Sequence, residues 1–225
     1  MKKIYLLLLL LIPMLFSFKE QQKKKFRIRF KNPKEIEVFW SPIDQKFVLT
    51  KGMNIVDFGA GEPSLAFYLL NKYDSINVVT QDIDTTYISD YKIDSVKRFY
   101  GKFDKKFLKM KIPFVMGNET STNLPKNKFD AVILTAVHHE LVYKDATIKD
   151  LHEALKADGR LYVSELVAHR KIKRPECDNY FSIESELVAD YETRDFVLEK
   201  KIVNEIYHKG KKNKTENACF IFKKK

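Results

Sequence analysis

The sequence predicts one α/β domain whose mostly parallel sheet is covered by helices on both faces. Apolar runs typical of buried strands alternate with amphipathic segments typical of helices from residue 54 onwards. Polar or glycine-rich turns follow these runs, as expected where a strand leads into a right-handed crossover to a parallel neighbour. With 225 residues, the chain is long enough for one such domain but too short for two.

The first half of the domain begins with "EIEVFWSPIDQKFVL", in which we expect a short lead-in helix. "NIVDF" then predicts a buried strand, "PSLAFYLLNKY" a helix with Pro63 near its first turn, and "INVVTQD" a second strand. Between Ile88 and Phe107, apolar residues recur at three- to five-residue steps, which predicts one long helix.

The second half continues the alternation. "IPFVM" predicts a third strand, "FDAVILTA" a fourth, "ATIKDLHEALKA" a helix that ends before Asp158, and "GRLYVSEL" a fifth strand. After a helix in "SIESELVADYE", the strands "FVLEKKIVNEIY" and "NACFIFKKK" are expected to finish the sheet as an antiparallel hairpin across the polar turn at residues 209–216.

Residues 1–18 have the layout of a secretory signal peptide, with Lys2 and Lys3 before an apolar run. The run from Ile4 to Phe16 is shorter than the roughly 20 residues that span a bilayer as a helix. Because Ser17 is the one small residue near a cleavage point, an uncleaved membrane anchor stays open. The protein is thus expected to be exported, periplasmic or secreted, if the signal is cleaved, and membrane-anchored otherwise. We expect a basic linker at residues 19–34 and the domain at residues 35–225.

The formal net charge is +11, and nearly all of the excess is lysine. The lysines gather in residues 19–34, 102–111 and 209–225, without aromatic residues at stacking intervals and without a helix-turn-helix or zinc pattern. This favours a solvated surface over a nucleic-acid interface. Nucleic acid is therefore not expected as a partner, and the oligomeric state is not predicted.

The turn "DFGAGEPS" after the first predicted strand indicates a ligand site. Gly59 and Gly61 let the backbone approach a ligand at the carboxyl edge of the sheet, where α/β folds bind ligands. A nicotinamide dinucleotide site would need G-x-G-x-x-G, but Ser64 takes the place of the third glycine. Asp57 would repel a pyrophosphate and attract an amino or sulfonium group, so a ligand with positive charge is favoured.

This turn resembles the first motif of class I S-adenosylmethionine-dependent methyltransferases, with Pro63 where the family usually has glycine. In "VVTQDIDTTYI", Asp82 matches the acid that accepts hydrogen bonds from both ribose hydroxyls, with Ile83 packed on the adenine and Asp84 as the register alternative. Asn118 matches the polar residue that meets the adenine amino group.

The resemblance continues through "TAVHHEL" at the exit of the fourth strand, which implies that Thr135 contacts the cofactor, and through "LKADGRLYVSEL". It covers residues 52–166 and is closest in outline to predicted methyltransferases with an N-terminal export signal. It implies a Rossmann-like fold with a seven-stranded sheet and a C-terminal antiparallel hairpin, S-adenosylmethionine as cofactor, and cofactor contacts through Asp57, Gly59, Gly61, Asp82, Ile83, Asn118 and Thr135.

His138, His139 and Glu140 are the candidate catalytic residues, because they follow the fourth strand on the side expected to hold the methyl group. A histidine there could be a general base, since its pKa lies near neutral pH. Binding of a metal beside Glu140, or a structural role for both histidines, stays open, and no metal site is predicted. Glu165, at the end of the fifth strand, could also face the substrate cavity.

The expected reaction is methyl transfer from S-adenosylmethionine to an oxygen, nitrogen or carbon nucleophile on a small or lipid-like molecule. A non-catalytic binding module and a nicotinamide-dependent oxidoreductase are the alternatives, and Ser64 and Asp57 disfavour the second. The segment after the fifth strand could meet an anionic substrate or form a solvated loop. Its basic residues are Arg170, Lys171, Lys173 and Arg174.

Overall fold

The structure is a computed structural model that describes residues 28–203, except 176 and 178, and residues 215–225. The predicted signal or anchor at residues 1–18 lies outside the described residues, as does the turn of the C-terminal hairpin. Among the helices that are described, none has the length and apolar character needed to cross a bilayer.

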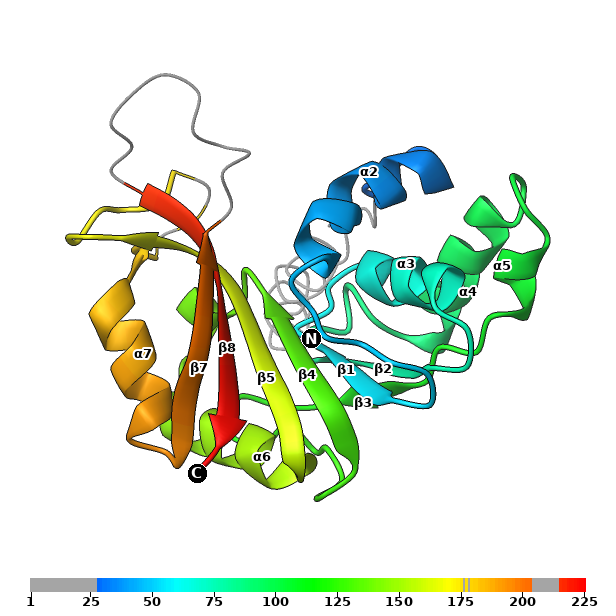
Figure 1. Cartoon of the computed structure of the whole chain (residues 1–225). Helices are drawn as coiled ribbons and strands as arrows, with labels where there is room; N and C mark the ends of the chain where they lie inside the picture. The colour runs from blue at the N-terminus through cyan, green and yellow to red at the C-terminus, as the bar shows by residue number, and fades with distance from the viewer. Residues whose placement is uncertain (1–27, 176, 178, 204–214) are drawn as a thin grey trace, which may run out of the picture.

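One sheet organises the described chain (Figure 1). Its strand order is β3-β2-β1-β4-β5-β8-β7, and a short strand, β6, pairs with the end of β5. The bounds are β1 Asn54–Phe58, β2 Asn77–Asp82, β3 Phe114–Met116, β4 Phe129–Thr135, β5 Leu155–Ala168, β6 Ser182–Ile183, β7 Phe196–Val203 and β8 Thr215–Lys224. β1 to β6 pair in parallel, whereas β8 pairs antiparallel with both β5 and β7. The predicted mostly parallel sheet with an antiparallel C-terminal pair is confirmed, and β6 is added to the seven expected strands.

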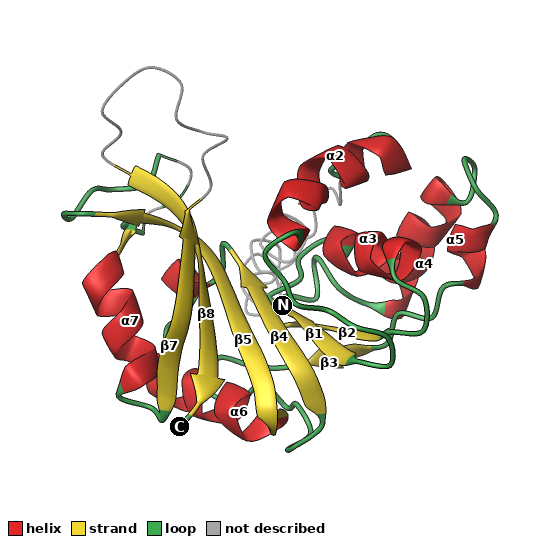
Figure 2. Cartoon of the chain, in the orientation of Figure 1, coloured by secondary structure: helices red, strands yellow, loops and turns green. Residues whose placement is uncertain are grey.

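Helices cover both faces of this sheet, as Figure 2 shows by secondary structure. One side carries α2 (Pro33–Asp44), α3 (Ser64–Lys72), α4 (Asp90–Tyr100) and α5 (Lys106–Lys109), and the other carries α6 (Lys144–Ala154) and α7 (Glu184–Glu192). A single turn of 3-10 helix, η2, spans His138–Glu140 after β4.

Two hydrophobic clusters lie on the two faces because successive residues of a strand point in opposite directions. In β1, Ile55 packs into the cluster under α2 to α5, and Val56 into the cluster under α6 and α7. In β4, Ile133 and Leu134 divide in the same way. The central strands are therefore buried on both sides, which explains their continuous apolar runs.

The single long helix expected between Ile88 and Phe107 is wrong. The chain forms α4 and α5, which are separated at Gly101. A Cβ atom on Gly101 would lie 2.6 Å from Leu108 Cδ2, so the missing side chain gives α5 room to fold back onto α4. The recurring apolar residues face the core from two helices rather than one.

The helix expected to end just before Asp158 ends earlier, at Ala154, and β5 begins directly after it, so that Asp158 as well as Gly159 lies within the strand. The pairing of β4 with β5 steps from Phe129↔Leu155 to Ala131↔Arg160, so β5 carries extra residues opposite β4. The polar pair thus marks an irregularity of the strand, where inserted residues are expected.

The folded chain extends N-terminal to residue 35. Asn32 caps α2 by accepting a hydrogen bond from the Glu35 amide at 3.0 Å, and Pro33 occupies the first turn of the helix. Phe30 is buried in the core. The last residues of the segment expected to be a linker therefore belong to the packed structure.

Candidate functional site

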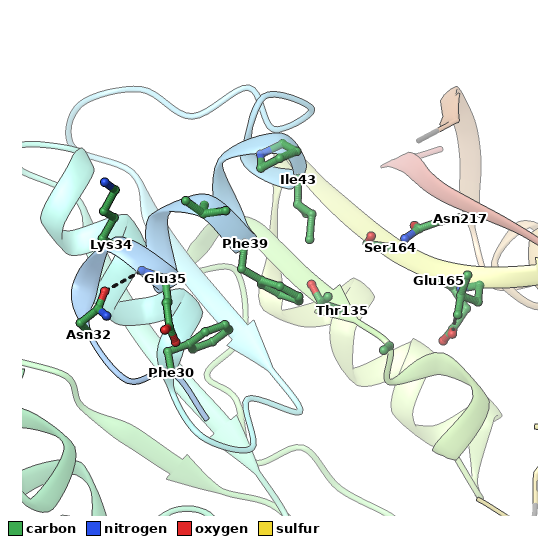
Figure 3. Close-up of a pocket in the computed structure, with 14 residues that line it drawn as sticks. Phe30, Asn32, Lys34, Glu35, Phe39, Ile43, Thr135, Ser164, Glu165 and Asn217 are labelled. Atoms are coloured by element: carbon green, nitrogen blue, oxygen red, sulfur yellow. Dashed lines mark hydrogen bonds between the residues drawn. The ribbon is translucent and has the colours of Figure 1, made fainter. Parts of the chain in front are cut away.

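Two cavities adjoin the carboxyl ends of the central strands. The β1–β2 cavity, of about 450 Å³, is formed by the turns that follow β1 and β2 and by the start of the segments after β3 and β4. Its wall includes Gly59, Gly61, Asp82, Ile83, Asn118 and Glu140. The α2 cavity, of about 700 Å³, lies between α2 and the ends of β4, β5 and β8 (Figure 3).

The two glycines of the turn after β1 have different reasons to be glycine. Both adopt the left-handed region, with φ of +63° at Gly59 and +51° at Gly61. A Cβ atom on Gly59 would lie 2.5 Å from Val137 Cγ2, so this glycine is required by packing. A Cβ atom on Gly61 would meet nothing within 4 Å. Gly61 therefore leaves open space in the cavity wall.

Asp82 holds this turn and the end of β2 together. Its Oδ2 accepts a hydrogen bond from the Gly61 amide at 2.7 Å, and its Oδ1 accepts from the amides of Ile83 at 2.7 Å and Asp84 at 2.9 Å. Asp84, the register alternative, instead accepts from the Thr86 amide. Ile83 is 52% exposed beside Asp82, so an apolar side chain stands open at the cavity.

Asp57 is a buried carboxylate just behind the cavity wall. Its Oδ2 has no hydrogen-bond partner among the described residues. Burial, helped by the nearby charge of Asp82 and opposed by a hydrogen bond from the Ala66 amide, raises the pKa of Asp57 to about 7. A cationic group nearby would favour the charged form of Asp57. The sequence likewise favours a ligand with positive charge at this site.

Asn118 lines the β1–β2 cavity, but its side-chain oxygen is already used. Oδ1 accepts from the Thr120 amide, the Thr120 hydroxyl and the Ser121 amide, each at 2.9 Å. This arrangement shapes the loop after β3 as an Asx turn does. The oxygen expected to face an adenine amino group is thus engaged within its own loop.

The segment after β4 separates the two cavities. Thr135 and Ala136 line the α2 cavity, whereas Val137 lines the β1–β2 cavity. Ala136 has a φ of +56°, which is unusual for a residue with a side chain, and its amide donates to the Ser164 carbonyl at 2.8 Å. The structure thus places Thr135, which the resemblance assigns to the cofactor, in the wall of the other cavity.

His138 lies in a buried network between η2 and α7. Its Nδ1 is 3.1 Å from the Tyr191 hydroxyl and its Nε2 is 3.4 Å from Asp190 Oδ2, which also accepts from Lys144 Nζ. Burial raises the pKa of Asp190, but hydrogen bonds from His138 and Lys144 outweigh it and the net pKa is lowered. The described cavity walls do not include His138.

His139 joins a second buried network, centred on Glu165. Glu165 Oε2 lies 3.1 Å from His139 Nδ1 and accepts from the His139 amide at 3.4 Å. Oε1 accepts from Arg174 Nη2 and from the Leu166 amide. Burial raises the pKa of Glu165, but the hydrogen bond and charge of His139 and the charge of Arg174 lower it overall.

The three candidate catalytic residues are therefore not brought together in one cavity. Glu140 lines the β1–β2 cavity and lies 3.7 Å from His139 Nε2, whereas neither histidine appears in the described wall of either cavity. Among the residues that the structure describes, no group of three or more His, Cys, Asp or Glu side chains could hold a metal ion.

Comparison with known families identifies the chain. A family model described as a methyltransferase domain matches residues 49–216. The chain belongs to this methyltransferase family. Membership confirms the class of enzyme and the cofactor, S-adenosylmethionine, that the motifs predicted. No curated protein matched the sequence.

Solved structures share the methyltransferase fold at low sequence identity. An S-adenosylmethionine-dependent methyltransferase from Methanosarcina mazei has a TM-score of 0.63 and 20% identity, over 81% of this chain and 97% of that chain. A TehB-like enzyme from Corynebacterium glutamicum has a TM-score of 0.56 and 19% identity, over 82% of this chain and 86% of that chain. SpnF, described as a [4+2]-cyclase, has a TM-score of 0.64 and 14% identity, over 84% of this chain and 81% of that chain.

The methyltransferase domain also contains contacts that sequence reasoning missed. The Glu62 carboxylate, within the glycine turn, accepts from the Arg29 amide and from the Tyr100 hydroxyl. Ser64 Oγ accepts from Trp40 Nε1 at 3.2 Å. The first two contacts tie the segment before α2 and the end of α4 to the turn after β1, and the third ties α2 to the start of α3. The only signal for them in the sequence was the amphipathic lead-in helix, which did not indicate where it packs.

Proposed function

We propose that this chain transfers a methyl group from S-adenosylmethionine to a nucleophile on a small or lipid-like molecule that binds in the α2 cavity. The observation that carries the proposal is the partition at residues 135–137, which places the cavity built from the cofactor motifs beside a second, separate cavity. Transfer needs the nucleophile in line with the methyl carbon and in direct contact with it, so the donor and the acceptor would have to meet at the edge of this segment.

The residues of the β1–β2 cavity fit the cofactor. Asp82 offers a carboxylate for the ribose hydroxyls, Ile83 an exposed apolar surface for the adenine, and Gly61 a backbone without a side chain in the way. Asp57 offers a buried oxygen, unpaired within the described chain, for the amino group of the methionine part. Asn118 lines the adenine end, where its amide nitrogen is the group left to donate a hydrogen bond.

The bound cofactor supplies an electrophilic methyl group on a sulfonium centre. The chain's own contribution is alignment of the two molecules and exclusion of water, which can lower a barrier substantially without a general base. We assign His138 and His139 a positioning role, because their ring nitrogens are engaged with Asp190, Tyr191 and Glu165. They fix the segment that separates the two cavities.

Calorimetric titration with S-adenosylhomocysteine tests the cofactor site. Wild-type chain should bind it with a dissociation constant below about 1 mM, a binding free energy of about −4 kcal/mol. Gly61→Ala should abolish binding because it adds a methyl group at a residue that lines the cavity. Gly52→Ala is the matched control, since Gly52 also has positive φ, of +86°, and open space around it but lies before β1. Equal affinities in the two variants, or no binding by wild type, would reject the proposed site.

Binding alone does not establish transfer, since SpnF has the same fold and is described as a cyclase. Transfer should be measured with methyl-tritiated S-adenosylmethionine and a panel of alcohols, phenols and amines. Label should pass into the organic extract with at least one acceptor class, and Asp82→Ala should reduce the rate markedly because it loses the ribose contact. A chain that binds the cofactor but labels no acceptor would be a binding module.

We also propose that residues 1–18 export the domain or anchor it to a membrane. The support is the sequence pattern of two lysines before an apolar run. Fractionation of cells that carry a topology reporter at residue 225 would distinguish a released domain from an anchored one. Recovery of the uncleaved chain in the soluble cytoplasmic fraction would contradict both.

A further inference from the structure

The α2 cavity has one predominantly apolar wall. This wall is formed by the start of the folded chain and one side of α2, with the side chains of Phe30, Val38, Phe39, Pro42 and Ile43. Figure 3 shows Phe39 pointing from α2 toward Thr135, with Ser164 and Glu165 across the cavity. Such a surface favours a ligand whose body is apolar, since its burial releases water from both partners.

Glu165 is the charged residue of the inner wall, but it has no capacity left for a ligand. An ionised carboxylate accepts about four hydrogen bonds. Glu165 receives four, from the His139 amide and ring, the Leu166 amide and Arg174. Its charge is compensated by Arg174, which is itself only 4% exposed. Glu165 therefore neither attracts a cation strongly nor serves as a base.

The other charges of the lining stay at the rim. Lys34 is exposed, and Glu35 accepts a hydrogen bond from the Lys31 amide at 2.8 Å. The basic segment after β5 does not supply an anion site in the cavity either. Arg174 is bound to Glu165, and Lys171 lies 4.5 Å from the centre of the Tyr180 ring. A charged acceptor would thus lose its hydration without gaining a buried opposite charge that is unpaired.

Hydroxyl groups provide the polar recognition that is left. Thr135 Oγ1 is buried and has no hydrogen-bond partner among the described residues. Ser164 contributes a second hydroxyl-bearing side chain to the same wall. A buried polar atom without a partner is costly, and a hydroxyl on a ligand can both donate to it and accept from it.

From these contacts we infer that the α2 cavity binds a neutral, largely apolar acceptor that carries a hydroxyl group. The apolar body lies against α2 and the hydroxyl lies at Thr135. This inference rests on the proposed function, because it names the acceptor class for the same reaction.

Three probes that share a 4-butylphenyl body and differ in charge test it. Each is titrated calorimetrically into the full chain saturated with S-adenosylhomocysteine: 4-butylphenol, 4-butylbenzoate and 4-butylbenzylammonium. The neutral phenol should bind at least about tenfold more tightly than either ion, a difference of about 1.4 kcal/mol. Equal or tighter binding of the carboxylate or the ammonium ion would overturn the inference.

Variants then locate the probe. Thr135→Val keeps the shape of the side chain and should weaken 4-butylphenol about tenfold while leaving 4-butyltoluene, which lacks the hydroxyl, unchanged. Val38→Asp, which places a charge in the apolar wall, should weaken both probes. Val48→Asp is its control, because Val48 is also exposed, at 59%, but lies outside the cavity. If Thr135→Val leaves the affinity for 4-butylphenol unchanged, the hydroxyl group of the phenol does not bind Thr135, and the inference fails.

The two proposals fail separately. If S-adenosylhomocysteine does not bind, the proposed function fails before any probe is added. If it binds normally and the three probes bind alike, only the choice of acceptor class is wrong.

Discussion

The β1–β2 cavity and the α2 cavity adjoin the same partition but are built in different ways. The β1–β2 cavity is made largely from backbone turns that directly follow β1 and β2, with positive φ at Gly59 and Gly61 and amides held by Asp82. The α2 cavity is made from side chains that come from both ends of the domain, from Phe30 to Asn217. A site of the first kind leaves a local motif, and a site of the second kind does not.

The two cavities also differ in what keeps them in shape. Neutral amides converge on one carboxylate beside the β1–β2 cavity, whereas buried charges pair beside the α2 cavity at Glu165 and Arg174. Removal of one partner from a buried charge pair is more costly than loss of a neutral hydrogen bond. The largest change in stability is therefore expected beside the α2 cavity, although the cofactor motif is elsewhere.

The largest expected effect is that of Glu165→Gln. The change removes the buried charge that pairs with Arg174 and should lower the free energy of unfolding by about 3–5 kcal/mol, as measured by urea denaturation. Glu199→Gln removes a half-exposed pair with Arg160 and should cost less than about 1 kcal/mol. If the two variants lose similar amounts, Glu165 does not hold the wall of the α2 cavity.

Gly59→Ala should have the next largest effect, on the β1–β2 side. Positive φ and the clash with Val137 together should cost about 3 kcal/mol of unfolding free energy and also abolish binding of S-adenosylhomocysteine. Gly52→Ala bears only the strain of positive φ, so about 1 kcal/mol is expected. Denaturation and titration of both variants would show whether packing adds to strain, and identical losses would contradict it.

The pH dependence of cofactor binding should follow Asp57. If the ligand binds the charged form and the pKa in the free protein is about 7, affinity for S-adenosylhomocysteine should fall about tenfold from pH 8 to pH 6. Titration at a series of pH values measures this. Asp57→Asn should flatten the profile and, at pH 8, raise the stability of the free protein by removing a buried charge. A steep profile in the variant would assign the effect to another group.

The same group has a stability consequence of defined sign. Because burial raises the pKa of Asp57 in the folded protein, its contribution to stability is fully present below about pH 4 and is lost as the pH rises to about 7. Glu165 and Asp190 act in the opposite sense, since their pKa values are lowered and their contribution is lost as the pH falls. Urea denaturation of Asp57→Asn and Glu165→Gln beside wild type, over a range of pH, separates these opposing contributions to stability.

The smallest effect is expected at the contact between α2 and α3. Ser64→Ala leaves Trp40 Nε1 without its acceptor and should cost about 1 kcal/mol. Trp40 is the only tryptophan in the sequence, so a shift of its fluorescence would report the loosened contact between α2 and α3. Ser95→Ala, on the exposed side of α4, should change neither stability nor emission by a comparable amount. An unshifted emission in Ser64→Ala would argue against the link.

Much of the fold could be predicted because its elements leave local patterns. The buried strands "NIVDF" and "FDAVILT" carry continuous apolar runs, and the glycine turn together with Asp82 and Asn118 indicates the cofactor. The errors came where contacts distant in sequence decide the outcome. Gly101 ends α4 because Leu108 packs over it, and Asp158 lies among the extra residues of β5 where the pairing with β4 shifts register. The role of the histidines could not be predicted, since their partners Asp190 and Glu165 lie far along the chain.

The sequence by itself determined most of the order of helices and strands along the chain, the family and its cofactor. A few neighbouring residues are enough to set a turn that needs glycine, or to place a carboxylate at the end of a strand. Only the tertiary structure decided that Thr135 faces the α2 cavity, that the charge of Glu165 is fully engaged, and that α2 forms the wall of a second cavity. The physical reason is that hydrogen-bond saturation and burial belong to side chains gathered from distant segments, and no local pattern records which segments meet.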